Sequence, residues 1–341
     1  MAQQHLEPTD PTARAVSGDA LAGYLRAQAT EFLRALRLHR ETGTAAGAAE
    51  ESVDAARALR RSARRISGSL HTFRPLLEAD WSEEIRPELA WLSGTLGLEH
   101  AYEARLQRLL LALHRLSGST ALPGQATSEV RTDRGNLTVG AAKAGALLDR
   151  QLTLARTRAH STALQALGSS RFHAVADKVA VLASEVPLTA AAPTADLRPA
   201  AAAAEERLTD AIAALPLVTA GHPYNAEALV HGLSPDPSPH PQDGPWHQVR
   251  LLLRLHRYAR EVLCGQGAPV DVRLLTAGQA LNRHRDASEA AAAAAAAART
   301  PRIAPATAYA LGVLHADQRH EVEAARFAFQ QAWQEQPLEA V

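Results

Sequence analysis

AARALRRSARRISGSLHTF, residues 55–73, is the stretch that decides the fold of this chain. On a helical wheel of about 100° per residue, its arginines fall on one side and its large apolar residues on the other. The apolar side consists of Leu59, Ala63, Ile66, Leu70 and Phe73. The pattern predicts an amphipathic helix that packs one face against a core and carries a row of positive charge on the other.

A second stretch, WHQVRLLLRLHRYAREVL at residues 246–263, repeats this spacing of cations. Offsets of i, i+3 and i+7 put side chains on one face of a helix. They are filled by Arg57, Arg60 and Arg64 in the first stretch and by His247, Arg250 and Arg254 in the second. The repetition predicts an internal duplication, with repeats at about residues 14–167 and 170–336.

Three residues of the second stretch need separate interpretation. Arg257 extends the cationic row. Glu261 lies on the same face, where it can pair with an arginine, whereas His256 points away and is expected to be packed. The helix should therefore be buried on several sides, with only its charged row exposed.

Composition indicates an all-α protein. Apolar residues make up 46% of the 341 residues but aromatic residues only 4%, and long sheets favour β-branched and aromatic side chains. We expect residues 1–13 to be disordered, 337–341 to form a tail, and 117–136, 187–199 and 234–245 to be loops. The expected helices are 18–40, 45–77, 81–116 (entered through Pro87), 141–167, 172–184, 200–215, 246–263, 270–299 and 306–336.

The charge pattern points to an anionic partner. The formal net charge is zero, but six arginines and no carboxylate occur between residues 55 and 77. Like charges at helical spacing repel, so helix stability does not explain them. Arginine offers forked donors that match phosphate oxygens. The competing interpretation is a pair of solvated faces that form salt bridges with neighbouring helices.

Other functional classes have little support in the sequence. Cys264 is the only cysteine, so no disulfide framework or thiolate metal site is expected. No secretory signal or membrane span is found, and the cytoplasm is the default location. His284 with Asp286, and His315 with His320, are poorly spaced as metal ligands, so we expect no metal and no cofactor.

The two cationic stretches resemble the signatures of the CHAD domain family (conserved histidine α-helical domain). The second follows the family pattern of His247, basic residues at +3, +7 and +10, then Tyr258 and Glu261. Further similar segments are Trp91–Gly97, Arg171-Phe172, Arg283–Asp286 and Leu311-Gly312. The resemblance covers residues 14–336. It implies two pseudo-symmetric four-helix bundles with a basic central groove, which bind inorganic polyphosphate without catalysis and associate with polyphosphate granules.

The candidate ligand residues combine the two rows with this resemblance. They are Arg57, Arg60, Arg61, Arg64, Arg65, His71, His247, Arg250, Arg254, Arg257 and Tyr258. The chain departs from the family at Arg57, which replaces a histidine, at Ser67 and Leu255, which replace basic residues, and at His100-Ala101, which replaces an Arg-Asp pair. These departures leave room for weakened binding.

Three alternatives remain open. Nucleic acid or an acidic protein could occupy the same groove, although Tyr258 is the only aromatic member of the two rows and base stacking usually needs more. A scaffold without a ligand is the second alternative, and an enzyme acting on polyphosphate or phosphate esters ranks last. We also expect affinity to rise as the pH falls towards 6, because His247 would become charged.

Overall fold

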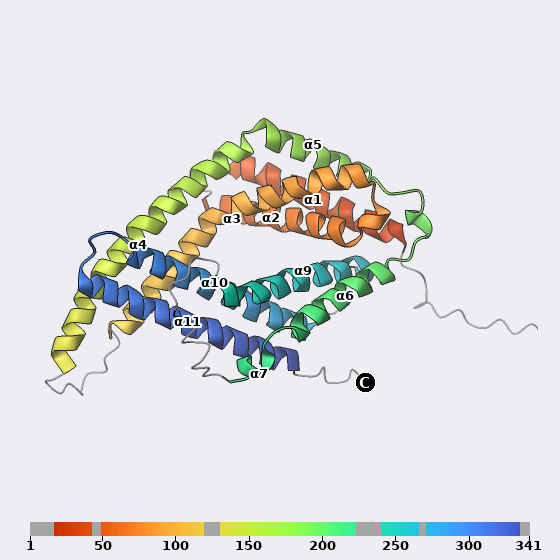
Figure 1. Ribbon diagram of the computed structural model, residues 1–341. Coiled ribbons are helices and arrows are strands. Elements are labelled where there is room, and N and C mark those ends of the chain that lie inside the picture. Colours follow the sequence, from red (N-terminus) through yellow and green to blue (C-terminus); the bar gives the residue numbers. More distant parts are fainter. Residues whose placement is uncertain are drawn as a thin grey trace, which may run out of the picture. The chain divides into compact units, whose positions relative to one another are not determined.

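In the computed structural model the chain is built from α-helices (Figure 1). The structure describes residues 17–42, 49–118, 130–222, 233, 240–265 and 271–334. Within these residues it contains ten α-helices, three short 3-10 helices and one isolated β-bridge. The all-α prediction is confirmed, whereas the disorder expected for residues 1–13 and the tail expected at 337–341 concern residues outside the described part of the chain.

The chain forms two compact units assembled from interleaved segments. Unit 1 comprises residues 1–93, 173–206 and 255–268, and unit 2 comprises 94–172, 207–254 and 269–341. The boundaries fall inside helices and do not follow the two expected repeats. The duplication and its four-helix bundles stay a prediction.

Unit 1 is built around the first two helices. α1 (Gly18–Thr42) and α2 (Ala49–Thr72) lie side by side (Figure 1). The unit also contains η2 (Arg74–Leu76), η3 (Ala192–Thr194), the first part of α3 (Ala79–Leu116), most of α5 (Ser170–Ser184), the start of α6 (Arg198–Ala213) and the end of α9 (Gly244–Cys264). Its core includes Leu25, Phe32, Leu59, Ile66, Leu70 and Phe73, all inaccessible to solvent.

The segment after α5 is more ordered than the expected linker at 187–199. Leu188 forms an antiparallel bridge with Leu77, and the Thr189 amide donates to the Leu76 carbonyl at 3.0 Å. Ala192 and Leu197 are fully buried. Proline and alanine content therefore predicted the break in helix but not the packing of the connection.

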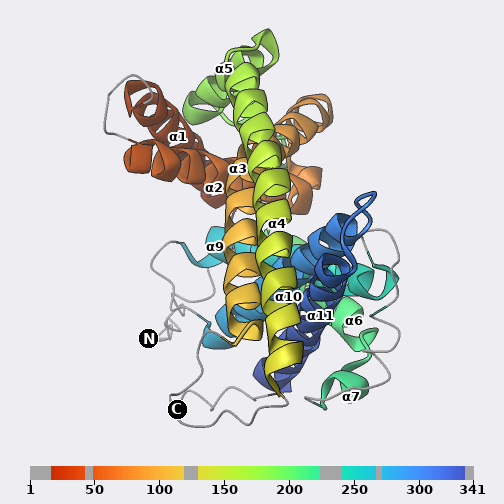
Figure 2. The same cartoon turned by 90° about the vertical axis from the view of Figure 1, so that its left-hand side faces the viewer.

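Unit 2 contains the longest helices. They are the end of α3, α4 (Val130–Leu167), α10 (Val272–Ala298) and α11 (Pro305–Gln334), joined by the rest of α6, α7 (Leu217–Ala220), η4 (Pro241–Asp243) and the start of α9. The C-terminal part of α3 runs beside α4 (Figure 2), and α10 lies beside α11. One core cluster includes Leu113, Leu148 and Leu314; a second surrounds Trp246 and Phe329.

Two expected boundaries are wrong. α4 begins at Val130, so residues 130–136 of the expected loop at 117–136 are helical. Extending a helix adds one hydrogen bond per ordered residue, which can offset the poor propensity of Gly135 and Asn136. α3 begins at Ala79 and continues through Pro87 rather than entering at it.

The nine consecutive alanines at residues 290–298, which end α10, contribute to the core. Ala290, Ala294 and Ala297 are fully buried against residues of α3, α4 and α11. Small side chains let these helices pack closely. At Gly140 of α4 the approach is so close that an added Cβ would lie 2.3 Å from the Ala306 carbonyl oxygen of α11.

Gly140→Ala should therefore destabilise the protein by about 1–3 kcal/mol, the usual cost of overpacking, because the opposing atom is backbone and cannot rotate away. Gly145→Ala is the matched control on the same helix, where the new Cβ would meet Leu110 at an ordinary 3.5 Å. It should be neutral or stabilise by up to about 1 kcal/mol. Urea unfolding measures the stability of both variants. Equal stabilities of Gly140→Ala and Gly145→Ala would contradict the close approach of α4 to α11 at Gly140.

Candidate functional site

The first cationic row lies on α2, as predicted. Arg57 and Arg61 are exposed and Arg60 and Arg64 are half-buried. The opposite face is fully buried at Leu59, Ala63, Ile66 and Leu70. The Arg57 guanidinium forms an ion pair with Asp54, one turn earlier, at 3.0 Å. The helix thus presents its arginines on the side opposite its core contacts.

Arg65 differs from Arg57 of the same row because its ion pair is half-buried and joins two helices. Its Nε and Nη2 donate to the two carboxylate oxygens of Glu261 at 2.8 and 3.2 Å. The Tyr24 hydroxyl donates to Glu261 Oε2 at 2.8 Å. The pairing of Glu261 with an arginine is therefore confirmed, and the partner comes from α2 rather than from α9 itself.

The surroundings of this pair shift the pKa values of its members. Burial raises the pKa of Tyr24 well above its ordinary value, and the charge of Glu261 and its hydrogen bond raise it further. Burial alone would lower the pKa of Arg65, but the hydrogen bond and charge of Glu261 outweigh it and raise that pKa. Tyr24 stays neutral and Arg65 stays charged, so the three groups form a stable donor–acceptor cluster.

Tyr258 packs beneath Arg65 and against α2. Its ring centroid lies 5.7 Å from the Arg65 guanidinium carbon, and only 9% of the residue is exposed. An added Cβ at Gly68 would lie 2.6 Å from the Tyr258 ring. The Tyr258 ring therefore fills the space that the absent side chain of Gly68 leaves beside α2.

Two further arginines of unit 1 lie near the end of the row and were missed by the sequence analysis. Arg86 Nη1 lies 3.5 Å from His71 Nδ1, and both Arg86 and Arg74 form ion pairs with Glu83. Arg86 belongs to the next helix, so a helical-wheel argument on α2 could not find it. The proximity of His71 to Arg86 supports a cationic surface that continues beyond α2.

The second row is divided between the two units. His247, Arg250 and Arg254 belong to unit 2, whereas Arg257 and Tyr258 belong to unit 1. Arg250 Nε donates to the Asn282 side-chain oxygen at 2.8 Å. The expected packing of His256 is confirmed, since 6% of it is exposed. A single groove that contains both rows stays a prediction.

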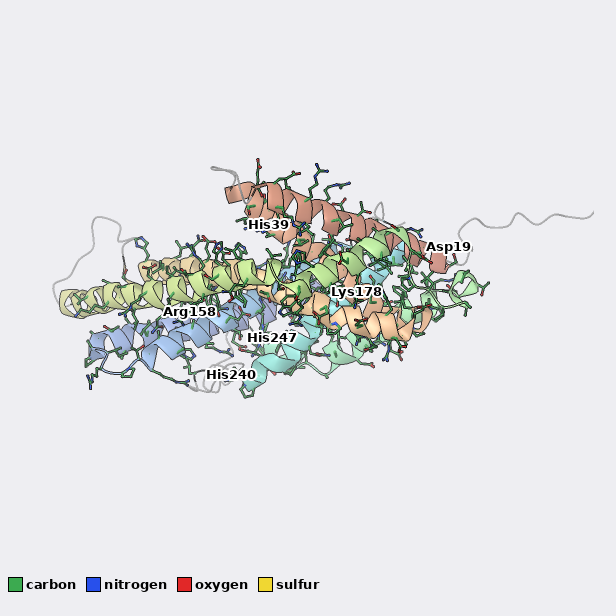
Figure 3. The ribbon with its side chains drawn as sticks, turned by 90° about the horizontal axis from the view of Figure 1, so that it is seen from above. Asp19, His39, Arg158, Lys178, His240 and His247 are labelled. Carbon is green, nitrogen blue, oxygen red and sulfur yellow. The ribbon has the colours of Figure 1, made fainter. Side chains whose placement is uncertain are left out.

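His247 packs against a second histidine. Figure 3 labels His247 on α9 and His240 just before η4. The His247 ring meets His284 edge-on, with centroids 5.5 Å apart, and the His284 ring stacks on Trp246 at 5.6 Å. His247 Nε2 is buried without a hydrogen-bond partner among the described residues. The row therefore begins at a half-buried histidine that packs against the His284 ring rather than at a solvated cation.

Beneath His247 lies a buried polar network centred on Asp243. Its carboxylate accepts hydrogen bonds from Arg319 Nη1 at 2.8 Å, from Arg326 Nη2 at 2.7 Å and from the Ser288 hydroxyl. Arg326 also donates to Glu323 at 2.7 Å. All five residues are under 8% exposed. Sequence analysis missed this network, because isolated Asp, Ser and Arg residues on three elements form no local motif.

Burial controls the titration of the two histidines. Burial lowers the pKa of His284 to about 4, although a hydrogen bond with Asp243 opposes the shift. The pKa of His247 is also lowered, first by burial and then by the charges of Arg250 and Arg285. Burial would raise the pKa of Asp243, but His284 and Arg319 outweigh it and lower that pKa strongly.

The described residues hold no group of three or more His, Cys, Asp or Glu side chains arranged to bind a metal ion. Among the same residues, no helix combines the length and apolar character that crossing a lipid bilayer requires.

The matches to known proteins cover most of the chain, including both cationic rows. The family model for the CHAD domain matches residues 27–295. The chain belongs to the CHAD domain family. A solved structure, PptA from Streptomyces chartreusis, is similar to this CHAD protein at 76% sequence identity and a TM-score of 0.79, over 93% of this chain and 99% of that one. No curated protein matches the chain.

Asp243→Asn should destabilise the protein by about 3–5 kcal/mol, the usual cost of breaking a buried ion pair, because Arg319 and Arg326 would lose their carboxylate. Asp286→Asn is the control, since Asp286 is an exposed carboxylate on the neighbouring helix α10. Urea unfolding measures both. Similar stabilities for the two variants would contradict a central role for Asp243.

Stability should also fall with acidification through His284. His284 takes up a proton near pH 6.5 in the unfolded chain and only near pH 4 in the folded chain. The folded state therefore loses stability as the pH falls from 6.5 to 4, and the loss ends near pH 4. The shift corresponds to a loss on the order of 3 kcal/mol. His284→Gln removes this proton, so its stability should vary less between pH 6.5 and 4 than that of the natural chain. Identical pH slopes would contradict the assignment.

Proposed function

We propose that this CHAD protein binds inorganic polyphosphate through the arginine rows of α2 and α9, without transforming it, and associates through this binding with polyphosphate granules. Membership of the CHAD family supports the ligand class. The single observation that carries the proposal is the exposed cationic face of α2, which lies opposite a fully buried apolar face.

The geometry of α2 suits a repeating anion. At about 1.5 Å per residue, the row from Arg57 to His71 extends about 20 Å along the helix. Arginine side chains at successive turns can each bind non-bridging oxygens of a different phosphate. Release of counterions would add a driving force that weakens with salt. A chain of phosphates should therefore bind better than a single phosphate.

Nucleic acid is the second candidate for this surface, and the environment of Tyr258 disfavours it. Single strands are usually bound by aromatic side chains on which bases stack. Tyr258 is the only aromatic member of the two rows, and it is packed between Arg65 and Gly68 with 9% of its surface exposed. Its ring is occupied by protein contacts, which favours a polyanion without bases.

The arginines that make up most of the two rows support binding without catalysis. Arginine keeps its proton at all physiological pH values, so it cannot act as a general acid or base there. Arginines can stabilise charge but supply no nucleophile. Incubation of the protein with polyphosphate should release no orthophosphate, and release that the charge-reversal variants below abolish would contradict this part of the proposal.

Titration calorimetry with long-chain polyphosphate tests the binding. The double variant Arg60→Glu, Arg64→Glu should abolish binding or weaken it by more than about a hundred-fold, since two attractive contacts become repulsive next to a polyanion. The matched control is Arg34→Glu, Arg37→Glu, which makes the same charge change on exposed residues of α1 in the same unit. Equal losses in both variants would indicate an effect of net charge only.

The second row is tested in the same way. Arg250→Glu, Arg254→Glu should also weaken binding, and Arg150→Glu, Arg158→Glu on exposed positions of α4 is its control. Binding that survives reversal of either row would restrict the site to the other row. Competition with duplex DNA at physiological salt separates the two ligand classes.

The pH dependence of affinity follows from the lowered pKa of His247. The expected rise in affinity is displaced to lower pH than an ordinary histidine would give, because burial and the neighbouring cations disfavour the charged ring of His247. Polyphosphate affinity should be flat from pH 8 to 6.5 and rise only below it. His247→Gln should remove the rise, and a rise between pH 8 and 7 that depends on His247 would contradict the assignment.

A further inference from the structure

Glu261 places a carboxylate among the cations that are proposed to bind polyphosphate. It accepts hydrogen bonds from Arg65 Nε and Nη2, so it occupies one complete edge of the guanidinium. That edge offers the two parallel donors with which arginine binds a phosphate bidentately. Glu261 therefore stands where a phosphate oxygen pair would otherwise stand.

The pair is fixed rather than transient. The side chains of Arg65 and Glu261 are 28% and 26% exposed. Tyr24 holds the carboxylate from α1, and the Tyr258 ring lies beside the guanidinium. Exposed ion pairs are weak because water and side-chain freedom compete with them. Here the neighbouring rings and partial burial reduce both effects, so an incoming anion must displace Glu261 to reach this edge of Arg65.

We propose that Glu261 is an affinity-limiting residue: it occupies Arg65 as an internal anion and so withholds this arginine from phosphate chains of every length. This inference rests on the proposed polyphosphate binding and deepens it. A contact withheld in this way lowers the affinity of short and long chains by about the same factor, because its free energy adds to that of the other contacts.

The contact with Arg65 would add to the other contacts that a phosphate chain makes with the arginines of α2. A bidentate arginine–phosphate contact is among the stronger hydrogen-bonded contacts in proteins, so its loss to Glu261 weakens binding measurably. In addition, the charge of Glu261 repels the phosphate that lies beside Arg65.

Calorimetry with tripolyphosphate and with long-chain polyphosphate tests the inference in the natural chain and in Glu261→Gln. The substitution keeps the size of the side chain and removes its charge. Tripolyphosphate should bind roughly five- to ten-fold more tightly, because Arg65 gains a charge-assisted contact with it. Its salt slope should steepen by about 0.7, the value for one more cation engaged on a flexible polyanion. Long-chain affinity should rise by a similar factor, because the same contact is gained.

Two further variants separate the contact from net charge. Arg65→Gln, Glu261→Gln removes both partners and should return tripolyphosphate affinity to that of the natural chain. Glu41→Gln removes an exposed carboxylate that pairs with Arg37 on α1, and it should leave both affinities unchanged. Glu261→Asp replaces Glu261→Gln in this test if Glu261→Gln does not fold. It keeps the charge but shortens the side chain by one methylene, which withdraws the carboxylate from Arg65, so it should also tighten tripolyphosphate binding.

The outcomes distinguish the inference from the proposed function. A natural chain that binds no long-chain polyphosphate overturns the proposed function and the inference together. Long-chain binding with no gain for tripolyphosphate in Glu261→Gln or Glu261→Asp overturns the inference alone. An equal gain in Glu41→Gln, or one that persists without Arg65, also overturns it.

Discussion

The buried carboxylate of Asp243 is the interaction on which unit 2 depends. It lies directly before α9 and binds Arg319 and Arg326 of α11 and Ser288 of α10. A carboxylate without solvent is costly unless its oxygens are fully hydrogen-bonded, and here several donors converge on it. The same network underlies the His284 ring, which in turn packs against His247. The position of the first residue of the α9 row is therefore set by groups that lie beneath the surface.

The arginines of this protein serve two different purposes, and only the structure separates them. Arg319 and Arg326 are buried and form ion pairs with internal carboxylates. Arg65 is half-buried and pairs with Glu261. Arg57 and Arg61 on α2 are exposed. A ligand therefore meets a surface whose charge is smaller than the count of arginines suggests, and the acidic residues that reduce it come from distant parts of the sequence.

Helical periodicity predicted which faces of α2 and α9 are buried and which are charged, because it is a local property of the sequence. The amphipathic division of α2, the packed His256 and the pairing of Glu261 all follow from positions on one helix face. The helix after residue 130 was missed because helix propensity is a weak guide beside cooperative extension. Arg86, Tyr24 and the Asp243 network were missed for another reason: each depends on contacts between elements far apart in sequence. The occupied space above Gly68 belongs to this second group, since a glycine pattern does not say which side chain fills the gap.

The alanine-rich core of unit 2 has a thermodynamic consequence. Alanine loses no rotamer freedom on burial, so ordering α10 against α4 and α11 has a small side-chain entropy cost. The same residues bury little apolar surface each, and the heat-capacity change of unfolding scales with that surface. A core of this kind gives a shallow temperature dependence of stability, with less loss on cooling than a core of large aliphatic and aromatic residues would show.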